Sequence, residues 1–151
     1  MELDSLPKRA KRLEALFASA PFGKTMGMKL SYTADFEAVF DLPHHRSLEH
    51  AMGDTHGGAI ATLLDNAGWF TAAIHYDNWI ATVELQVRML EPARKEDLRA
   101  KGRLVRAGTS LAVAEMEVRT TAGRLVAVGS GTFSRTSRPL PALRPPGISE
   151  G

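Results

Sequence analysis

A single aspartate interrupts a long apolar stretch of the chain. The stretch runs from His56 to Ile74, and Asp65 is its only acidic residue. Burying an unpaired carboxylate is strongly unfavourable, so an ionisable group in such surroundings is usually paired, protonated or functional. A helix-interior aspartate paired with an arginine or a hydroxyl is the structural alternative. The apolar neighbours and an adjacent pair of glycines favour a functional Asp65.

The same stretch opens with His56-Gly57-Gly58, which suits the first turn of a helix. A helix N-terminus offers N–H groups without intrahelical partners and a partial positive charge. Glycines there let a ligand atom approach the backbone closely. Such a terminus suits a carbonyl oxygen that becomes an oxyanion during acyl transfer. The glycines could also serve only to pack a helix tightly on a sheet, and the tripeptide alone does not decide between the two.

The spacing of these residues predicts an oligomer. Asp65 follows His56 by nine residues, which is about 13 Å along an α-helix, and the two point to roughly opposite sides of it. One chain cannot easily bring both groups to one substrate atom. A two-fold dimer can, if Asp65 of one subunit faces the His56–Gly57 end of the other. Thr62, Asp65 and Asn66 would then look towards a second subunit.

The elements that position these residues follow from hydrophobic periodicity and turn signals. We expect an apolar helix from about Gly57 to His75, capped at its start by Asp54 or Thr55, with His75 interacting favourably with its last carbonyls. Strands are expected at residues 29–33, 37–42, 80–90, 98–107, 111–120 and 125–133. The first two would pair as a hairpin, and the last three or four would form an antiparallel meander. Because no strand–helix–strand alternation appears, the class predicted is α+β.

Three segments are expected along the chain. Residues 1–22 should form an amphipathic helix that starts at Ser5, ends at Pro21 and packs on the domain, with a membrane-surface helix as the less favoured alternative. Residues 23–136 would hold the main domain. Residues 137–151, rich in proline, would be a flexible tail.

Composition excludes several function classes. The chain has 151 residues, enough for one domain, and its formal charge of +2 does not indicate nucleic acid or a membrane. No cysteine is present, which excludes disulfides, cysteine nucleophiles and thiolate metal sites. His44, His45, His50 and His56 lack a recognised ligand spacing, so no metal or other cofactor is predicted. With neither a signal peptide nor a long apolar span in the sequence, the location predicted is the cytoplasm.

Two motifs taken together carry a family resemblance. His56-Gly57-Gly58 followed by Leu64-Asp65-Asn66-Ala67 resembles the signature of hotdog-fold acyl-CoA thioesterases of the phenylacetate-pathway (PaaI-like) type. The similarity extends through residues 87–93 and 123–127 and covers roughly residues 24–135. It implies a hotdog fold, with an antiparallel sheet wrapped around a long central helix, and an acyl-CoA substrate. It also implies a homodimer at least, with a homotetramer expected.

The resemblance implies a role for each matching residue. Asp65 would be the nucleophile or the general base on water, the Gly57 N–H would polarise the thioester carbonyl, and His56 would help to orient it. Thr82 matches a position where relatives often place a hydroxyl near the attacking water. His50 is a departure, because many relatives carry an asparagine there. It could donate a hydrogen bond, titrate near neutral pH, or mark a different reaction.

Further residues are candidates for substrate contact. Strand alternation puts Arg99, Lys101 and Arg103 on one face, where a solvated sheet surface is the plainer explanation. The functional alternative is a seat for the coenzyme A phosphates, built from Arg103 and Arg106. Gly58, Asn66 and Trp69 complete the set, although Trp69 should be mainly a core residue.

Two other functions stay open for this sequence. One is a hotdog enoyl-thioester hydratase or dehydratase, which also draws a histidine and an acid from two subunits. The other is a non-catalytic acyl-CoA-binding module. The presence of Asp65 argues against the second, and His50 keeps it open.

Overall fold

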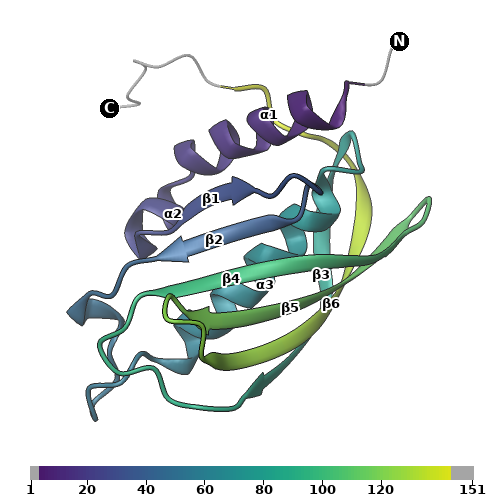
Figure 1. The fold of residues 1–151 in the computed structure, drawn as a ribbon. Helices are drawn as coiled ribbons and strands as arrows, with labels where there is room; N and C mark the ends of the chain where they lie inside the picture. The colour runs from purple at the N-terminus through teal and green to yellow at the C-terminus, as the bar shows by residue number, and fades with distance from the viewer. Residues whose placement is uncertain (1–3, 144–151) are drawn as a thin grey trace.

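One antiparallel sheet packs against one long helix in the computed structural model, which describes residues 4–143 (Figure 1). The six strands lie in the order β1-β2-β4-β5-β6-β3. The strands are β1 (Lys29–Tyr32), β2 (Ala38–Leu42), β3 (Asn78–Met89), β4 (Leu98–Ala107), β5 (Leu111–Thr120) and β6 (Leu125–Pro139). The helices are α1 (Leu6–Ser19), α2 (Pro21–Met26) and α3 (Gly57–Ala73), with a short 3-10 turn at Arg46–Leu48. The predicted α+β class is confirmed.

The strand order shows that the predicted meander has three strands and not four. β1 and β2 form the predicted hairpin, and β4, β5 and β6 form the predicted meander. β3 does not join this meander at β4. It pairs instead with β6, from Ile80 opposite Arg135 to Met89 opposite Ala127. The irregular connection between Met89 and Leu98 carries the chain across the end of the sheet, so β3 becomes an edge strand.

α3 is buried along most of its length because it lies against the inner face of the sheet. Leu63, Leu64 and Ala67 have no exposed surface. The close approach depends on glycine: a Cβ added at Gly102 of β4 would lie 2.3 Å from the backbone oxygen of Ala67. The missing side chain therefore lets the helix and sheet backbones come together, and it fixes how α3 crosses the sheet.

α1 lies along the β1 side of the sheet (Figure 1). Its Phe17 packs edge-to-face on Phe40 of β2 and Phe70 of α3, with ring centroids 4.9 and 5.4 Å apart. The predicted start is confirmed, since Ser5 is the N-cap. α1 ends at Ser19, just before the Pro21 expected to stop it, but Pro21 then opens a second helix, α2, that the sequence did not predict. The fixed φ of proline suits a first helical turn.

The C-terminal end of α3 is held by α1. Arg9 donates a hydrogen bond of 3.1 Å to the carbonyl of Ile74. That contact replaces the expected one from His75. Burial, and secondarily the charge of Arg9, lower the pKa of His75, which is the opposite of what a favourable carbonyl contact would do.

Two boundaries differ from those expected. The N-cap of α3 is His56, not Asp54 or Thr55, because the His56 side chain accepts the N–H of Gly58. β6 continues to Pro139 because its last residues pair with the start of β3, so the predicted tail does not begin at residue 137. Residues 144–151 of that tail lie outside the described part. Between residues 4 and 143, no helix combines the length and apolar character that crossing a membrane requires.

Candidate functional site

Asp65 lies at the margin of α3, beside β3, and not in the core. Its Oδ1 accepts a hydrogen bond of 2.8 Å from the Thr82 hydroxyl on β3. Asp65 is half-buried and Thr82 is exposed. The apolar residues of α3 point into the sheet, while the carboxylate keeps access to solvent. The carboxylate of Asp65 therefore avoids the cost of burial, because it lies at the edge of the apolar helix. Its hydrogen-bond partner is the Thr82 hydroxyl, and no ion pair with arginine or lysine holds it within residues 4–143.

The N-terminus of α3 presents one unused donor. His56 Nδ1 accepts the N–H of Gly58 at 2.8 Å, so the neutral ring carries its proton on Nε2. The Gly57 N–H is the first of the helix, and no hydrogen bond from it occurs within residues 4–143. A Cβ added at Gly57 would meet only the Met89 methyl, at 3.5 Å. Gly57 is only half-buried, so the backbone at the start of α3 is accessible to a ligand.

His50 is held in the same manner as His56. Its ring Nδ1 accepts the backbone N–H of Met52 at 3.0 Å, and the backbone N–H of His50 donates to the carbonyl of Asp54 at 2.9 Å. The neutral imidazole again keeps its proton on Nε2. The loop that carries His50 is tied to the start of α3, because the backbone N–H of His56 donates to the carbonyl of Leu48 at 2.7 Å. Both histidines thus offer an Nε2–H donor.

Within one chain, Asp65 and Gly57 lie beside well-separated parts of β3. Thr82 holds Asp65, whereas Met89 lies beside Gly57. The two positions are about 20 Å apart along the strand and about 12 Å apart along the helix. A carbonyl oxygen bound at Gly57 is therefore not placed beside the Asp65 carboxylate of the same chain.

The remaining α3 candidates are engaged in local contacts. Asn66 Nδ2 donates back to the carbonyl of Thr62 at 2.8 Å. Trp69 is buried, and its Nε1 donates to the carbonyl of Ile80 at 2.8 Å. The Gly58 N–H is occupied by His56. Trp69 belongs to the contact between α3 and β3, and Asn66 remains at the half-buried margin next to Asp65.

Arg103 and Arg106 lie on the sheet face opposite α3. Arg103 forms an ion pair with Glu115 on the neighbouring strand. Simple alternation would turn Arg106 to the other face. A register shift after Leu104 brings Arg106 opposite Val113, which shares a face with Glu115. The two arginines therefore share the outer face, as a phosphate seat would require.

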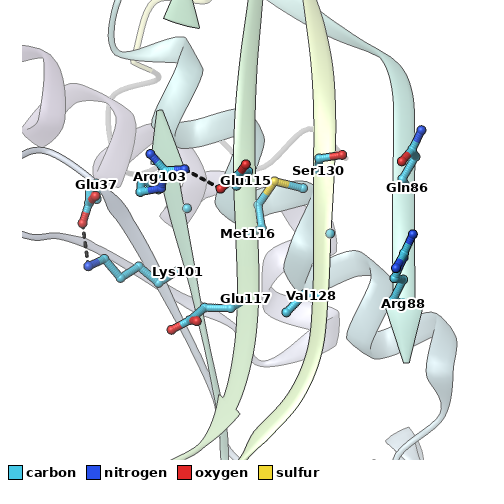
Figure 2. Close-up of a pocket in the computed structure, with 12 residues that line it drawn as sticks. Glu37, Gln86, Arg88, Lys101, Arg103, Glu115, Met116, Glu117, Val128 and Ser130 are labelled. Atoms are coloured by element: carbon cyan, nitrogen blue, oxygen red, sulfur yellow. Dashed lines mark hydrogen bonds and ion pairs between the residues drawn. The ribbon is translucent and has the colours of Figure 1, made fainter. Parts of the chain in front are cut away.

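Figure 2 shows an open groove of about 570 Å³ on this outer face. Its charged lining comprises Glu37, Arg88, Lys101, Arg103, Glu115 and Glu117. Lys101 is paired with Glu37 at 2.6 Å, so part of the charge is already neutralised. Because Asp65 and Gly57 lie on the α3 side, the groove is not part of the candidate site.

The histidines before α3 are used by the protein itself. His44 Nε2 lies 2.9 Å from Glu49 Oε1, and His45 Nε2 lies 3.1 Å from the carbonyl oxygen of Met26. Across residues 4–143, no three His, Asp or Glu side chains gather closely enough to hold a metal ion.

The profile of the thioesterase superfamily matches residues 52–127, a range that includes Gly57, Asp65 and Thr82. A predicted esterase of Halobacterium salinarum is 36% identical over 121 residues, which cover 72% of this chain and 80% of that protein.

Two solved structures share the architecture. A thioesterase family protein of Silicibacter pomeroyi is 25% identical with a TM-score of 0.76, over 83% of this chain and 96% of that one. The PaaI protein of the E. coli phenylacetic acid degradation operon is 19% identical with a TM-score of 0.81, over 89% of this chain and 99% of that one. The sheet wrapped against α3 is the hotdog fold.

Proposed function

The chain belongs to the thioesterase superfamily, and on that premise we propose that it hydrolyses an acyl-CoA thioester to a free acid and coenzyme A. Membership supports thioester hydrolysis in general. The carbon-to-sulfur bond to coenzyme A and the roles of individual residues are our proposal. One observation carries it: a carboxylate positioned by a hydroxyl at the margin of α3, together with an unused N–H at the start of the same helix.

Asp65 is the general base or the nucleophile in this proposal. Its Oδ1 is held by Thr82, which leaves Oδ2 to take a proton from water as the water oxygen attacks the carbonyl carbon. The carbon–sulfur bond then breaks, and the departing thiolate takes up the proton from Asp65. Alternatively, Oδ2 attacks that carbon directly, the thiolate leaves, and water then hydrolyses the mixed anhydride. Both routes return Asp65 to its ionised form and need no metal or redox cofactor.

The start of α3 stabilises the developing charge. The Gly57 N–H donates to the carbonyl oxygen as it becomes an oxyanion, assisted by the helix dipole. His56 Nε2–H helps to orient the same oxygen. His50 Nε2–H replaces the amide that relatives carry and donates to the water or the substrate. Gly58 and Asn66 line the approach, and Trp69 supports it from the core.

A dimer brings the two halves together. The outer edge of β3, which is 12 residues long, has no strand beside it within residues 4–143. Two such edges can pair antiparallel about a two-fold axis. If Thr82 of one chain lies beside Met89 of the other, the axis passes between Leu85 and Gln86. Asp65 of each chain then approaches Gly57 of its partner.

Arg103 and Arg106 are proposed ligands for the coenzyme A phosphates. Since they lie on the outer sheet face, they would serve a substrate bound at a neighbouring subunit's site in a homotetramer. We also propose a cytoplasmic location, in keeping with a coenzyme A substrate.

The first test is thiol release from short, long and aromatic acyl-CoAs, with Asp65→Asn as the negative control. We expect wild-type turnover of at least one substrate and a loss of at least about a hundred-fold in the variant. Wild-type activity that Asp65→Asn retains would contradict the proposal. An enoyl-CoA that loses its absorbance without releasing thiol would indicate a hydratase, and tight binding without turnover would indicate a binding module.

The second test asks whether one active site uses two chains. Gly57→Pro deletes the proposed donor, and proline is well tolerated at the first helical position. Gly57→Pro and Asp65→Asn should each be inactive. If the site is shared, mixing equal amounts through unfolding and refolding restores about a quarter of wild-type sites, since half of the dimers are mixed and each has one intact site. No recovery in mixed dimers would place the site within one chain.

A further inference from the structure

One methionine lies beside the Cα of Gly57. Met89 is the last residue of β3, and its terminal methyl would lie 3.5 Å from a Cβ built on Gly57, closer than any other described atom outside the adjoining residues and the backbone of α3. Met89 is 48% exposed in the single chain. A group bound at the Gly57 N–H is therefore close to a thioether that is apolar and flexible.

Met89 ends an apolar stripe on the α3 side of β3. Alternation turns Gln86 and Arg88 to the outer face, where they line the groove (Figure 2). Leu85 and Val87 turn to the other side and pack, partly buried, on the core. Leu90, directly after the strand, is 51% exposed. The surface that leads away from Gly57 thus carries hydrocarbon and no charged group from β3.

We propose that Met89 determines acyl specificity, so that the enzyme takes apolar acyl groups and discriminates against branching at the carbon next to the thioester carbonyl. This inference rests on the proposed function and names the substrate class of the same site. With the carbonyl oxygen on the Gly57 N–H, the neighbouring carbon lies within reach of the Met89 methyl. A straight methylene packs against the thioether. A branch must displace it, and a charged acyl group would lose its hydration against this surface.

The test compares two substrates in three proteins. The substrates are hexanoyl-CoA and its analogue with a methyl branch next to the carbonyl. The proteins are wild type, Met89→Ala and the control Leu111→Ala, which truncates a residue of similar exposure, 50%, in the β4–β5 hairpin. We expect Met89→Ala to raise the branched-to-straight ratio of kcat/KM about ten-fold. Leu111→Ala should leave that ratio unchanged. A Met89→Ala ratio equal to that of wild type would overturn the proposal.

A binding measurement separates this inference from the hydrolase proposal. Ketone analogues of the two substrates, in which a methylene stands between the sulfur and the carbonyl, cannot be hydrolysed. Their Kd ratio should shift in Met89→Ala as the kcat/KM ratio does. Wild type that binds the ketones but hydrolyses no thioester contradicts only the hydrolase, provided Met89→Ala shifts the ratio. An unshifted Kd ratio, or no binding of either ketone, overturns the role of Met89.

Discussion

The Thr82 hydroxyl donates a hydrogen bond of 2.8 Å to Oδ1 of Asp65, joining the edge strand β3 to the only carboxylate of α3. This bond fixes one carboxylate oxygen of Asp65 against β3. A base or nucleophile gains from such positioning, because less rotational freedom is lost when the reaction geometry forms. Thr82 is therefore a positioning residue in the proposed reaction.

Replacing Thr82 by valine should lower kcat about ten-fold with little change in KM, because a hydrogen bond to a charged group is lost. Valine has nearly the same shape and suits a strand, so the thermal unfolding midpoint should stay close to wild type. Steady-state kinetics of Thr82→Val and Thr82→Ser measure this. Thr82→Ser keeps the hydroxyl and should retain most activity; a Thr82→Val enzyme as active as wild type would mean that the hydrogen bond to Asp65 does not matter.

Two glycine-to-alanine changes should differ strongly in their effect on the free energy of unfolding. Gly102→Ala places a Cβ 2.3 Å from the backbone oxygen of Ala67, and we expect a loss of about 3 kcal/mol or more in the free energy of unfolding. Gly57→Ala meets only the Met89 methyl at 3.5 Å and should be neutral or slightly stabilising. Urea unfolding of both variants checks this. A neutral Gly102→Ala would mean that α3 does not approach β4 as closely as described.

His56 has a structural and a proposed chemical role that two variants separate. His56→Ala removes the N-cap and should cost about 1 kcal/mol of stability. His56→Asn restores a capping acceptor but not the Nε2–H donor, so it should recover stability and not kcat. Calorimetry and thiol release on both variants give the answer. Full activity in His56→Asn would limit His56 to capping.

Acid should destabilise the fold partly through His75, whose pKa is lowered by burial and by Arg9. Because the folded pKa lies below the unfolded value of 6.5, the unfolded chain binds the proton first as the pH falls. This contribution to stability is complete above the unfolded pKa and declines as the pH drops through it towards the folded value. His75→Gln should therefore lose less stability than wild type between about pH 8 and about pH 5. Unfolding midpoints at both pH values test this, and identical losses would contradict it.

Local pattern was sufficient for much of the fold. The bounds of β4 and β5 match those predicted from alternation and turn residues. The alternation of apolar and polar residues predicts which face of the sheet a side chain points to, but not which strand is the hydrogen-bonded neighbour. The crossing of β3 to β6 could therefore not be read from it. Alternation alone also does not give the face of Arg106, since that face depends on a register shift after Leu104.

The site was partly predictable because its residues are close in sequence. Gly57 and Asp65 belong to one helix, and Thr82 was linked to Asp65 through a family resemblance. Met89 was missed as a neighbour of Gly57, because only the packing of β3 on α3 brings them together. The cap of α3 was also missed, because histidine is not among the usual capping residues.

The sheet order has a consequence for the growing chain on the ribosome. β3 is complete at Met89, but its partner within the chain, β6, ends at Pro139. During synthesis, β3, with its apolar Leu85 and Val87, therefore has no paired strand on either edge until β6 has emerged. Such a strand is prone to pair with other chains. A chain that ends before β6 should aggregate, whereas in the finished chain β3 has one open edge, the edge proposed to pair with a second copy.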